Sequence, residues 1–156
     1  MNTTLHKIAT SVMALAVTLL LGTGCASPQG GGLGRMPPGD YVGISGTQPK
    51  LPAVLSRGEQ LKVTVRYRIE SAAEAMILTR PYLKGRQAQG YVAHSAVLKS
   101  NGTGEAETWF SFRGKAEVDE IRVSLIDTAQ SRMLNNFSQE VSAQWQGKEE
   151  EVKGDR

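Results

Sequence analysis

The chain has 156 residues with 18 basic and 15 acidic side chains, and its formal net charge is +3. Because Lys7 is the only charged residue among the first 24, the remainder carries a net charge of +2, and this near balance argues against nucleic acid as a partner. A single cysteine, Cys25, and two histidines exclude an internal disulfide and a thiolate-based metal site in the folded part. We therefore expect one domain, no cofactor and no bound metal.

Residues 1–24 have the layout of a secretory signal peptide. Lys7 supplies the positive start, residues 8–21 form an apolar stretch, and small residues follow as far as Gly24. A transmembrane helix is the alternative. The apolar stretch has 14 residues, and as a helix it would be roughly 21 Å long, which is shorter than the roughly 30 Å hydrocarbon core of a bilayer. We therefore predict that residues 1–24 are cleaved from the mature protein.

The five residues Leu21-Gly22-Thr23-Gly24-Cys25 resemble the lipobox of bacterial lipoproteins. This resemblance covers only the first 25 residues, and it implies cleavage between Gly24 and Cys25 and lipid attachment to Cys25. An ordinary signal peptide followed by an accidental cysteine is the alternative. Because Ala26 follows the cysteine, the resemblance also implies sorting to the outer membrane, with the protein facing the periplasm.

Residues 25–39 are predicted to be the lipidated cysteine and a flexible linker, because Ser, Pro, Gln and Gly dominate them. The glycines at 30–34 do not predict a phosphate-binding loop, since no strand precedes them and no Lys-Ser or Lys-Thr pair follows. Residues 40–146 are the expected domain. Residues 147–156 are expected to form a disordered, charged tail.

The expected domain is dominated by apolar residues that recur at every second position. In the clearest run, residues 61–69, apolar side chains alternate with Lys62, Thr64, Arg66 and Arg68, which is typical of a half-buried strand. Further strands are predicted at 41–46, 75–83, 91–98, 105–113 and 120–125. Short strands with tight connections predict an all-β fold, an antiparallel two-sheet sandwich that is similar in architecture to immunoglobulin-like and fibronectin-like domains.

Two segments are ambiguous between strand and helix. Ser71 and Glu74 have the spacing of a helix capping box, so residues 71–80 fit a short helix as well as a strand. Residues 134–146 also fit both patterns. We favour a strand in both places, because the sandwich would otherwise contain six strands at most.

No catalytic residues are predicted. His94 is the only histidine in the expected domain, no Gly-x-Ser-x-Gly motif occurs, and we interpret His94 as a surface or edge-strand residue. Glu105 and Glu107 share one face of a predicted strand and are the candidates for a carboxylate pair in a hydrolase. Pairing of these carboxylates with cations on a neighbouring strand is the preferred interpretation.

The candidate binding face consists of Lys62, Arg66, Arg68 and Trp109. Trp109 is expected to point to the opposite side of its strand from Phe110 and is the candidate anchor for a sugar ring or a protein. The alternative for Trp109 is that it covers the stems of the arginines. The alternative is that Glu105 and Glu107 lie opposite the cations and neutralise them.

Three functions are compatible with these features. The first is a membrane-anchored envelope lipoprotein that acts as a non-enzymatic docking or structural module, with the membrane and an unknown envelope protein or glycan as partners. The second is a lipoprotein that binds a glycan or small molecule, and the third is an envelope hydrolase with paired carboxylates. We favour the first, because the sequence contains no nucleophile system.

Overall fold

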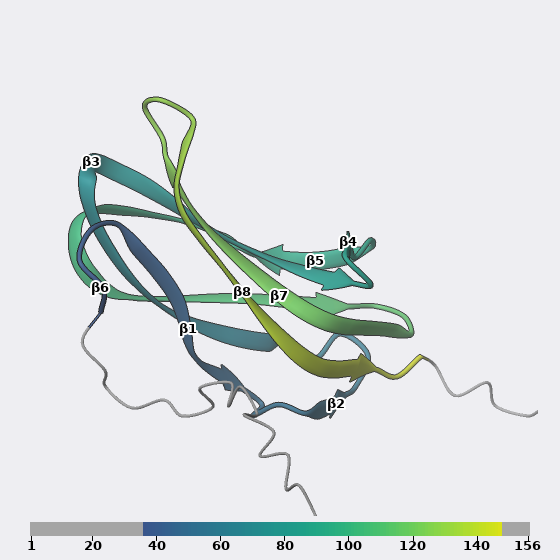
Figure 1. Ribbon diagram of the computed structural model, residues 1–156. Helices are drawn as coiled ribbons and strands as arrows, with labels where there is room; N and C mark the ends of the chain where they lie inside the picture. Colours follow the sequence, from purple (N-terminus) through teal and green to yellow (C-terminus); the bar gives the residue numbers. More distant parts are fainter. Residues whose placement is uncertain (1–35, 148–156) are drawn as a thin grey trace, which may run out of the picture. The chain divides into compact units, whose positions relative to one another are not determined.

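The computed structural model describes residues 36–147, and every regular element within them is a β-strand. The strands are β1 (Tyr41–Gln48), β2 (Ala53–Leu55), β3 (Leu61–Leu83), β4 (Arg86–Gln87), β5 (Tyr91–His94), β6 (Ala96–Phe112), β7 (Ala116–Asp127) and β8 (Arg132–Trp145) (Figure 1). The all-β prediction is therefore confirmed. These described residues include no helix that is long and apolar enough to cross a membrane. The predicted signal peptide, Cys25 and nearly all of the tail lie outside the described residues.

The strand β3 is 23 residues long and joins two strands that the sequence predicts separately. Its first half, 61–69, pairs with β1 and with the second half of β6, and its second half, 74–82, pairs with β7 and with the first half of β6. The register of β3 against β6 shifts between Ile69 and Glu74. This irregularity marks the place where β3 passes from one layer of the domain to the other.

The helix alternative for residues 71–80 is wrong. Ala75, Ile77 and Thr79 are buried while the residues between them are not, which is the period of a strand. Ser71, the expected helix cap, instead directs its hydroxyl to the carboxylate of Asp40. A strand prevails here because β6 and β7 satisfy its backbone groups on both sides.

The two halves of the long strands build two layers. The first layer contains β1, the first half of β3, the second half of β6, and β5. The second layer contains the first half of β6, the second half of β3, β7, β8 and β2. The two layers pack as the predicted sandwich requires, but they are not two separate sheets, because β3 and β6 belong to both layers and hydrogen bonds connect all strands into a single sheet.

The predicted strand at 91–98 also changes layer. Residues Tyr91 to His94 pair with the second half of β6, whereas Ala96 is already in register with Leu78 of β3. Between them, the carbonyl of Ser95 accepts a hydrogen bond of 2.8 Å from the Thr79 amide. The chain therefore changes layer at Ser95.

One pairing departs from the antiparallel prediction. The three-residue strand β2 runs parallel to the end of β8, with Ala53 opposite Ala143 and Leu55 opposite Trp145. The sequence did not predict β2, because three residues are too few to show a period. Residues 132–145 do form a strand, as favoured above, and the helix alternative for 134–146 is wrong. Pairing with β7 along the whole of β8 satisfies its backbone as a strand.

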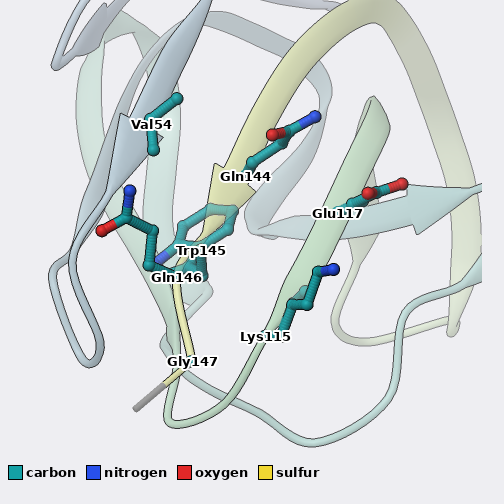
Figure 2. Close-up of a pocket in the computed structure, with 8 residues that line it drawn as sticks. Val54, Lys115, Glu117, Gln144, Trp145, Gln146 and Gly147 are labelled. Carbon is teal, nitrogen blue, oxygen red and sulfur yellow. The ribbon is translucent and has the colours of Figure 1, made fainter. Parts of the chain in front are cut away.

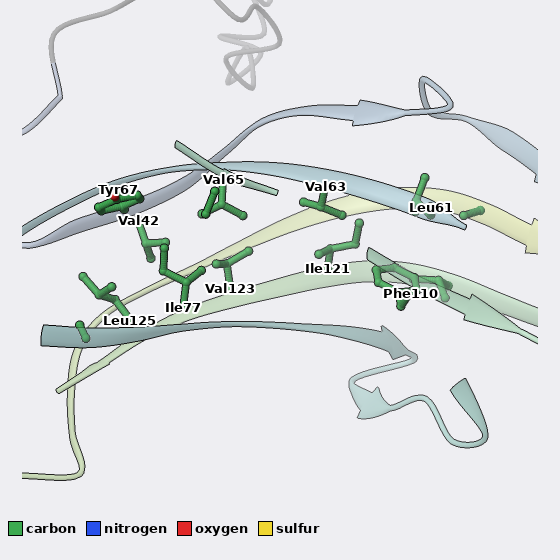
Figure 3. Packing of buried hydrophobic residues seen from close by; sticks show 14 of the residues in the cluster. Val42, Leu61, Val63, Val65, Tyr67, Ile77, Phe110, Ile121, Val123 and Leu125 are labelled. Carbon is green, nitrogen blue, oxygen red and sulfur yellow. The ribbon is translucent and has the colours of Figure 1, made fainter. Parts of the chain in front are cut away.

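The core lies between the layers, where Val63 and Val65 of β3 face Ile121 and Val123 of β7 (Figure 3). At one end an aromatic cluster forms, with ring centroids 4.9 Å apart for Phe112 and Trp145. Full burial of an aliphatic or aromatic side chain stabilises a fold by roughly 1.5 to 3 kcal/mol. The alternating residues identified in the sequence therefore supply most of the packing that holds the layers together.

The exposed edges of the sheet are irregular. Over residues 132–142, β8 pairs with β7 alone among the described strands, and its register shifts twice, near Val118 and near Leu125. The register of β1 shifts between Ile44 and Gly46. Bulges of this kind hinder pairing with another chain. The sheet faces are therefore the surfaces on which to seek a partner site.

Candidate functional site

The predicted cationic face lies on the outer side of the first layer, where acidic residues oppose it. Arg66 is in register with Glu105, and Lys62 lies two residues along β3 from Thr64, the register partner of Glu107. The Lys62 Nζ is 3.3 Å from a carboxylate oxygen of Glu107, and the Arg66 Nε is 3.9 Å from one of Glu105. The structure thus brings these cations together with the two carboxylates, as the alternative interpretation expected.

Arg68 has different partners from Lys62 and Arg66, the other two residues of the predicted cationic face. Its Nε lies 3.5 Å from a carboxylate oxygen of Glu70, and its Nη1 donates a hydrogen bond of 2.6 Å to the carbonyl of Pro37. Pro37 belongs to the last residues of the predicted linker. Arg68 therefore holds the incoming chain against the domain.

Asp40 fixes the same incoming chain to the bend of β3. Its carboxylate accepts hydrogen bonds from the amides of Glu70, at 2.8 Å, and Ser71, at 3.0 Å, and from the Ser71 hydroxyl. Its carbonyl accepts a hydrogen bond of 3.0 Å from the Asn135 side chain of β8. We call this set of contacts the Asp40 clamp.

The clamp also determines the protonation of Asp40. Burial alone would raise the pKa of this carboxyl, but the hydrogen bonds from the Ser71 hydroxyl and from the Glu70 and Ser71 amides outweigh it. The pKa of Asp40 is therefore lower than its ordinary value, and the clamp favours the charged form.

Trp109 is half-buried beside the first of the predicted cations. It is in register with Lys62 on β3 and with His94 on β5, while its neighbour Phe110 is fully buried. His94 is exposed on the short strand β5, which confirms its interpretation as a surface residue. Trp109 therefore lies between Lys62 on β3 and His94 on β5.

The two candidate carboxylates for a hydrolase both lie beside cations in the described part of the chain. Glu105 and Glu107 each lie beside a different cation, and His94 is not among their ion-pair partners. Residues 36–147 contain no group of three or more His, Cys, Asp or Glu that would hold a metal ion. The arrangement of Glu105 and Glu107 thus favours charge pairing over hydrolysis.

The described surface includes two depressions that are open to solvent. The larger of the two, of about 500 Å³, lies where β2 and β8 end and β7 begins, and it is lined by Val54, Lys115, Ala116, Glu117, Gln144, Trp145, Gln146 and Gly147 (Figure 2). Trp145 is only 1% exposed, so it offers little surface to a ligand. Each depression contains one glutamate, whereas a carboxylate hydrolase requires two acidic groups.

The smaller depression, of about 400 Å³, contains a preformed ion pair. The Arg122 Nε and Nη2 each donate a hydrogen bond of 2.8 Å to Glu120, and the guanidinium carbon lies 3.9 Å from the ring centroid of Tyr82. The hydrogen bond from Arg122 lowers the pKa of Glu120 and raises the pKa of Arg122. The charge of Arg122 is therefore already engaged within the domain.

An apolar surface that the binding-face prediction missed lies on the outer side of the second layer. Four residues on four adjacent strands are in register there: Leu98 of β6, Met76 of β3, Ile126 of β7 and Met133 of β8. Leu98 is 58% and Met133 is 54% exposed. We call these four residues the apolar row. The sequence contained one signal for it, since the run Ala75-Met76-Ile77-Leu78 is apolar on both faces of its strand.

Comparison with known proteins identifies no family for this chain. No family model and no curated protein matches it. Among solved structures, it is similar to one described as the periplasmic chaperone SfaE, with a TM-score of 0.43 and 10% sequence identity over 73% of this chain. The chain covers 59% of that chaperone's length. A likeness at this level does not indicate what the present chain binds.

Proposed function

We propose that this chain is a cell-envelope lipoprotein, anchored through lipid on Cys25 to the outer membrane and facing the periplasm, whose β domain is a non-enzymatic docking module. The lipobox resemblance at 21–25 supports the anchor. The apolar row carries the docking role. Four aligned apolar side chains, two of them more than half exposed, are a feature of surfaces that contact another component.

The cationic face supports docking less well. Lys62, Arg66 and Arg68 all have carboxylate partners within the domain, so a partner would have to replace ion pairs that already exist. The glycan alternative relies on Trp109, which is half-buried and borders neither depression. The apolar row, with four uncharged side chains of which Leu98 and Met133 are exposed, requires no such replacement.

Metabolic labelling with an alkyne fatty acid tests the anchor. We expect the wild-type chain to be labelled and Cys25→Ala to be neither labelled nor processed, because Cys25 carries the only thiol in the chain. The matched control is Ser27→Ala, which should be labelled normally. Fatty-acid labelling of Cys25→Ala would contradict the lipoprotein proposal.

Thiol accessibility in native membranes tests the docking role. Leu98→Cys and Val92→Cys each add one free thiol, at positions that are 58% and 42% exposed. On an uncovered domain, a membrane-impermeant maleimide should modify position 98 at least as fast as position 92. In cell membranes with both leaflets opened to the reagent, we expect the opposite order, because the envelope component covers position 98. Faster modification at position 98 in those membranes would contradict a docking role for the apolar row.

A further inference from the structure

The apolar row lies close to the place where the chain enters the domain. Asn135, which binds the carbonyl of Asp40, is two residues from Met133 on β8. The next register pair on the same face, Glu74 with Ser100, is close to the bend of β3 that the Asp40 clamp holds. The row and the incoming chain therefore share one end of the domain.

The length of the linker limits how far this end can be from the anchor. From Cys25 to Met36 there are eleven steps along the chain, which span at most about 40 Å when fully extended. Arg68 binds the carbonyl of Pro37, and the Glu70 amide binds the carboxylate of Asp40. The chain before Asp40 therefore cannot be lengthened by releasing these residues unless those hydrogen bonds break. A lipid on Cys25 would thus keep the end with the apolar row near the bilayer.

The charges on the same face are placed so that they would stay outside the hydrocarbon of the bilayer. Arg80 and Arg122 are opposite each other, four residues from Met76 and Ile126 respectively, which is about 13 Å along a strand. Glu74 is nearer, two residues from Met76, and its side chain accepts a hydrogen bond of 3.3 Å from the Thr128 hydroxyl. Glu74 would remain at the depth of the lipid head groups. The contact that this pattern permits is shallow and apolar.

From these observations we infer that the apolar row is the face with which the domain lies on the phospholipid bilayer that holds its anchor. The inference rests on the proposed lipidation of Cys25. It identifies the covering component as lipid and not as a protein. Leu98, Met76, Ile126 and Met133 would enter the interface between head groups and acyl chains, where their apolar surface leaves water.

The test uses the full, lipidated chain in vesicles of phosphatidylethanolamine and phosphatidylglycerol. Met133→Cys is labelled with an environment-sensitive fluorophore, and the vesicles contain lipids with a nitroxide near the head group. We expect a blue-shifted emission and a quenching several-fold stronger than that of the control, Val92→Cys with the same label. Leu98→Cys, at the other end of the row, should behave like Met133→Cys. Both substituted side chains are more than half exposed, so the fold should tolerate them.

Three results would overturn the inference. Equal quenching at positions 133, 98 and 92 would show that the row does not meet lipid. Strong shielding of positions 98 and 133 in cell membranes, with a crosslink to a protein and no quenching in vesicles, would assign the row to a protein partner. In both cases the chain would still carry its acyl label, so the proposed anchor would stand. Absence of that label would instead overturn the proposed anchor, and with it the inference.

Discussion

The hydroxyl oxygens of Thr79 and Thr108 lie 3.1 Å apart in the core, although the two residues belong to different layers. Both side chains are completely buried, and the Thr108 hydroxyl is also 3.3 Å from the carbonyl of Val63. Every buried side-chain nitrogen or oxygen among residues 36–147 has a hydrogen-bond partner. This hydroxyl pair is therefore a polar link between two apolar layers.

We expect Thr108→Val to cost more stability than Thr79→Val. The first change leaves the Thr79 hydroxyl buried without its partner, at a cost of about 1 to 3 kcal/mol, whereas the second leaves Thr108 bonded to Val63. The double variant should lose less than the sum of the single variants, because it leaves neither hydroxyl unpaired. Urea unfolding of all four proteins measures this, and strictly additive losses would contradict the hydroxyl link.

The Asp40 clamp should make stability depend on pH. The pKa of Asp40 is lower in the folded state than in the unfolded state, so the folded state binds fewer protons. The stability that the clamp contributes is therefore present in full above the ordinary carboxyl pKa and is lost as the pH falls through the lowered value.

Asp40→Ala isolates this contribution. At neutral pH we expect the variant to be less stable by about 1 kcal/mol, since charge-assisted hydrogen bonds at an exposed site are lost. The difference in urea midpoint between wild type and variant should shrink as the pH falls below about 4. A difference that is unchanged in acid would show that the charged carboxylate is not what stabilises the bend of β3.

The ion pairs on the first layer should be weak and specific. For Lys62 with Glu107, and for Arg66 with Glu105, double-mutant cycles to glutamine should give coupling energies of at most about 1 kcal/mol, because these groups are partly or largely exposed. Arg66 with Glu107 is the matched control and should show less coupling than either pair. Coupling of Arg66 to Glu107 that exceeds its coupling to Glu105 would contradict the observed pairing.

Trp145 should contribute far more to stability than Trp109. Its indole Nε1 donates a hydrogen bond of 2.8 Å to the Glu59 carbonyl, and its ring packs on Phe110 and Phe112. We expect Trp145→Phe to cost about 1 to 3 kcal/mol through the lost bond and the smaller ring. Trp109→Phe, at a half-buried position, should cost less than about 1 kcal/mol. Thermal unfolding of both variants compares them, and equal losses would contradict this ranking.

Much of the fold follows from alternation in the sequence. The runs at 61–69 and 120–125 predicted which side of each strand is buried, and Leu61, Val63, Ile121 and Val123 are all fully buried. What alternation does not encode is the partner of each strand half. The passage of β3 between layers depends on contacts of Ser71 with Asp40, 31 residues away, and such a contact leaves no periodic signal.

The candidate site was predicted only in part. Alternation correctly placed Lys62, Arg66 and Arg68 on an outer face, and cross-strand pairing with Glu105 and Glu107 was foreseen for that face. The apolar row was not, because its four members come from four strands and become neighbours only through the register. Single exposed apolar residues such as Leu98 and Met133 are common and carry no signal by themselves.

The 23-residue strand β3 also determines how the domain loses its structure. Because β3 and β6 each continue from one layer into the other, moving the half of either strand that lies in one layer also pulls on its half in the other layer. Neither layer can open as an independent unit while β3 remains extended. Amide hydrogens of β1, in the first layer, and of the β3-paired part of β7, in the second, should therefore share one opening free energy that equals the global value.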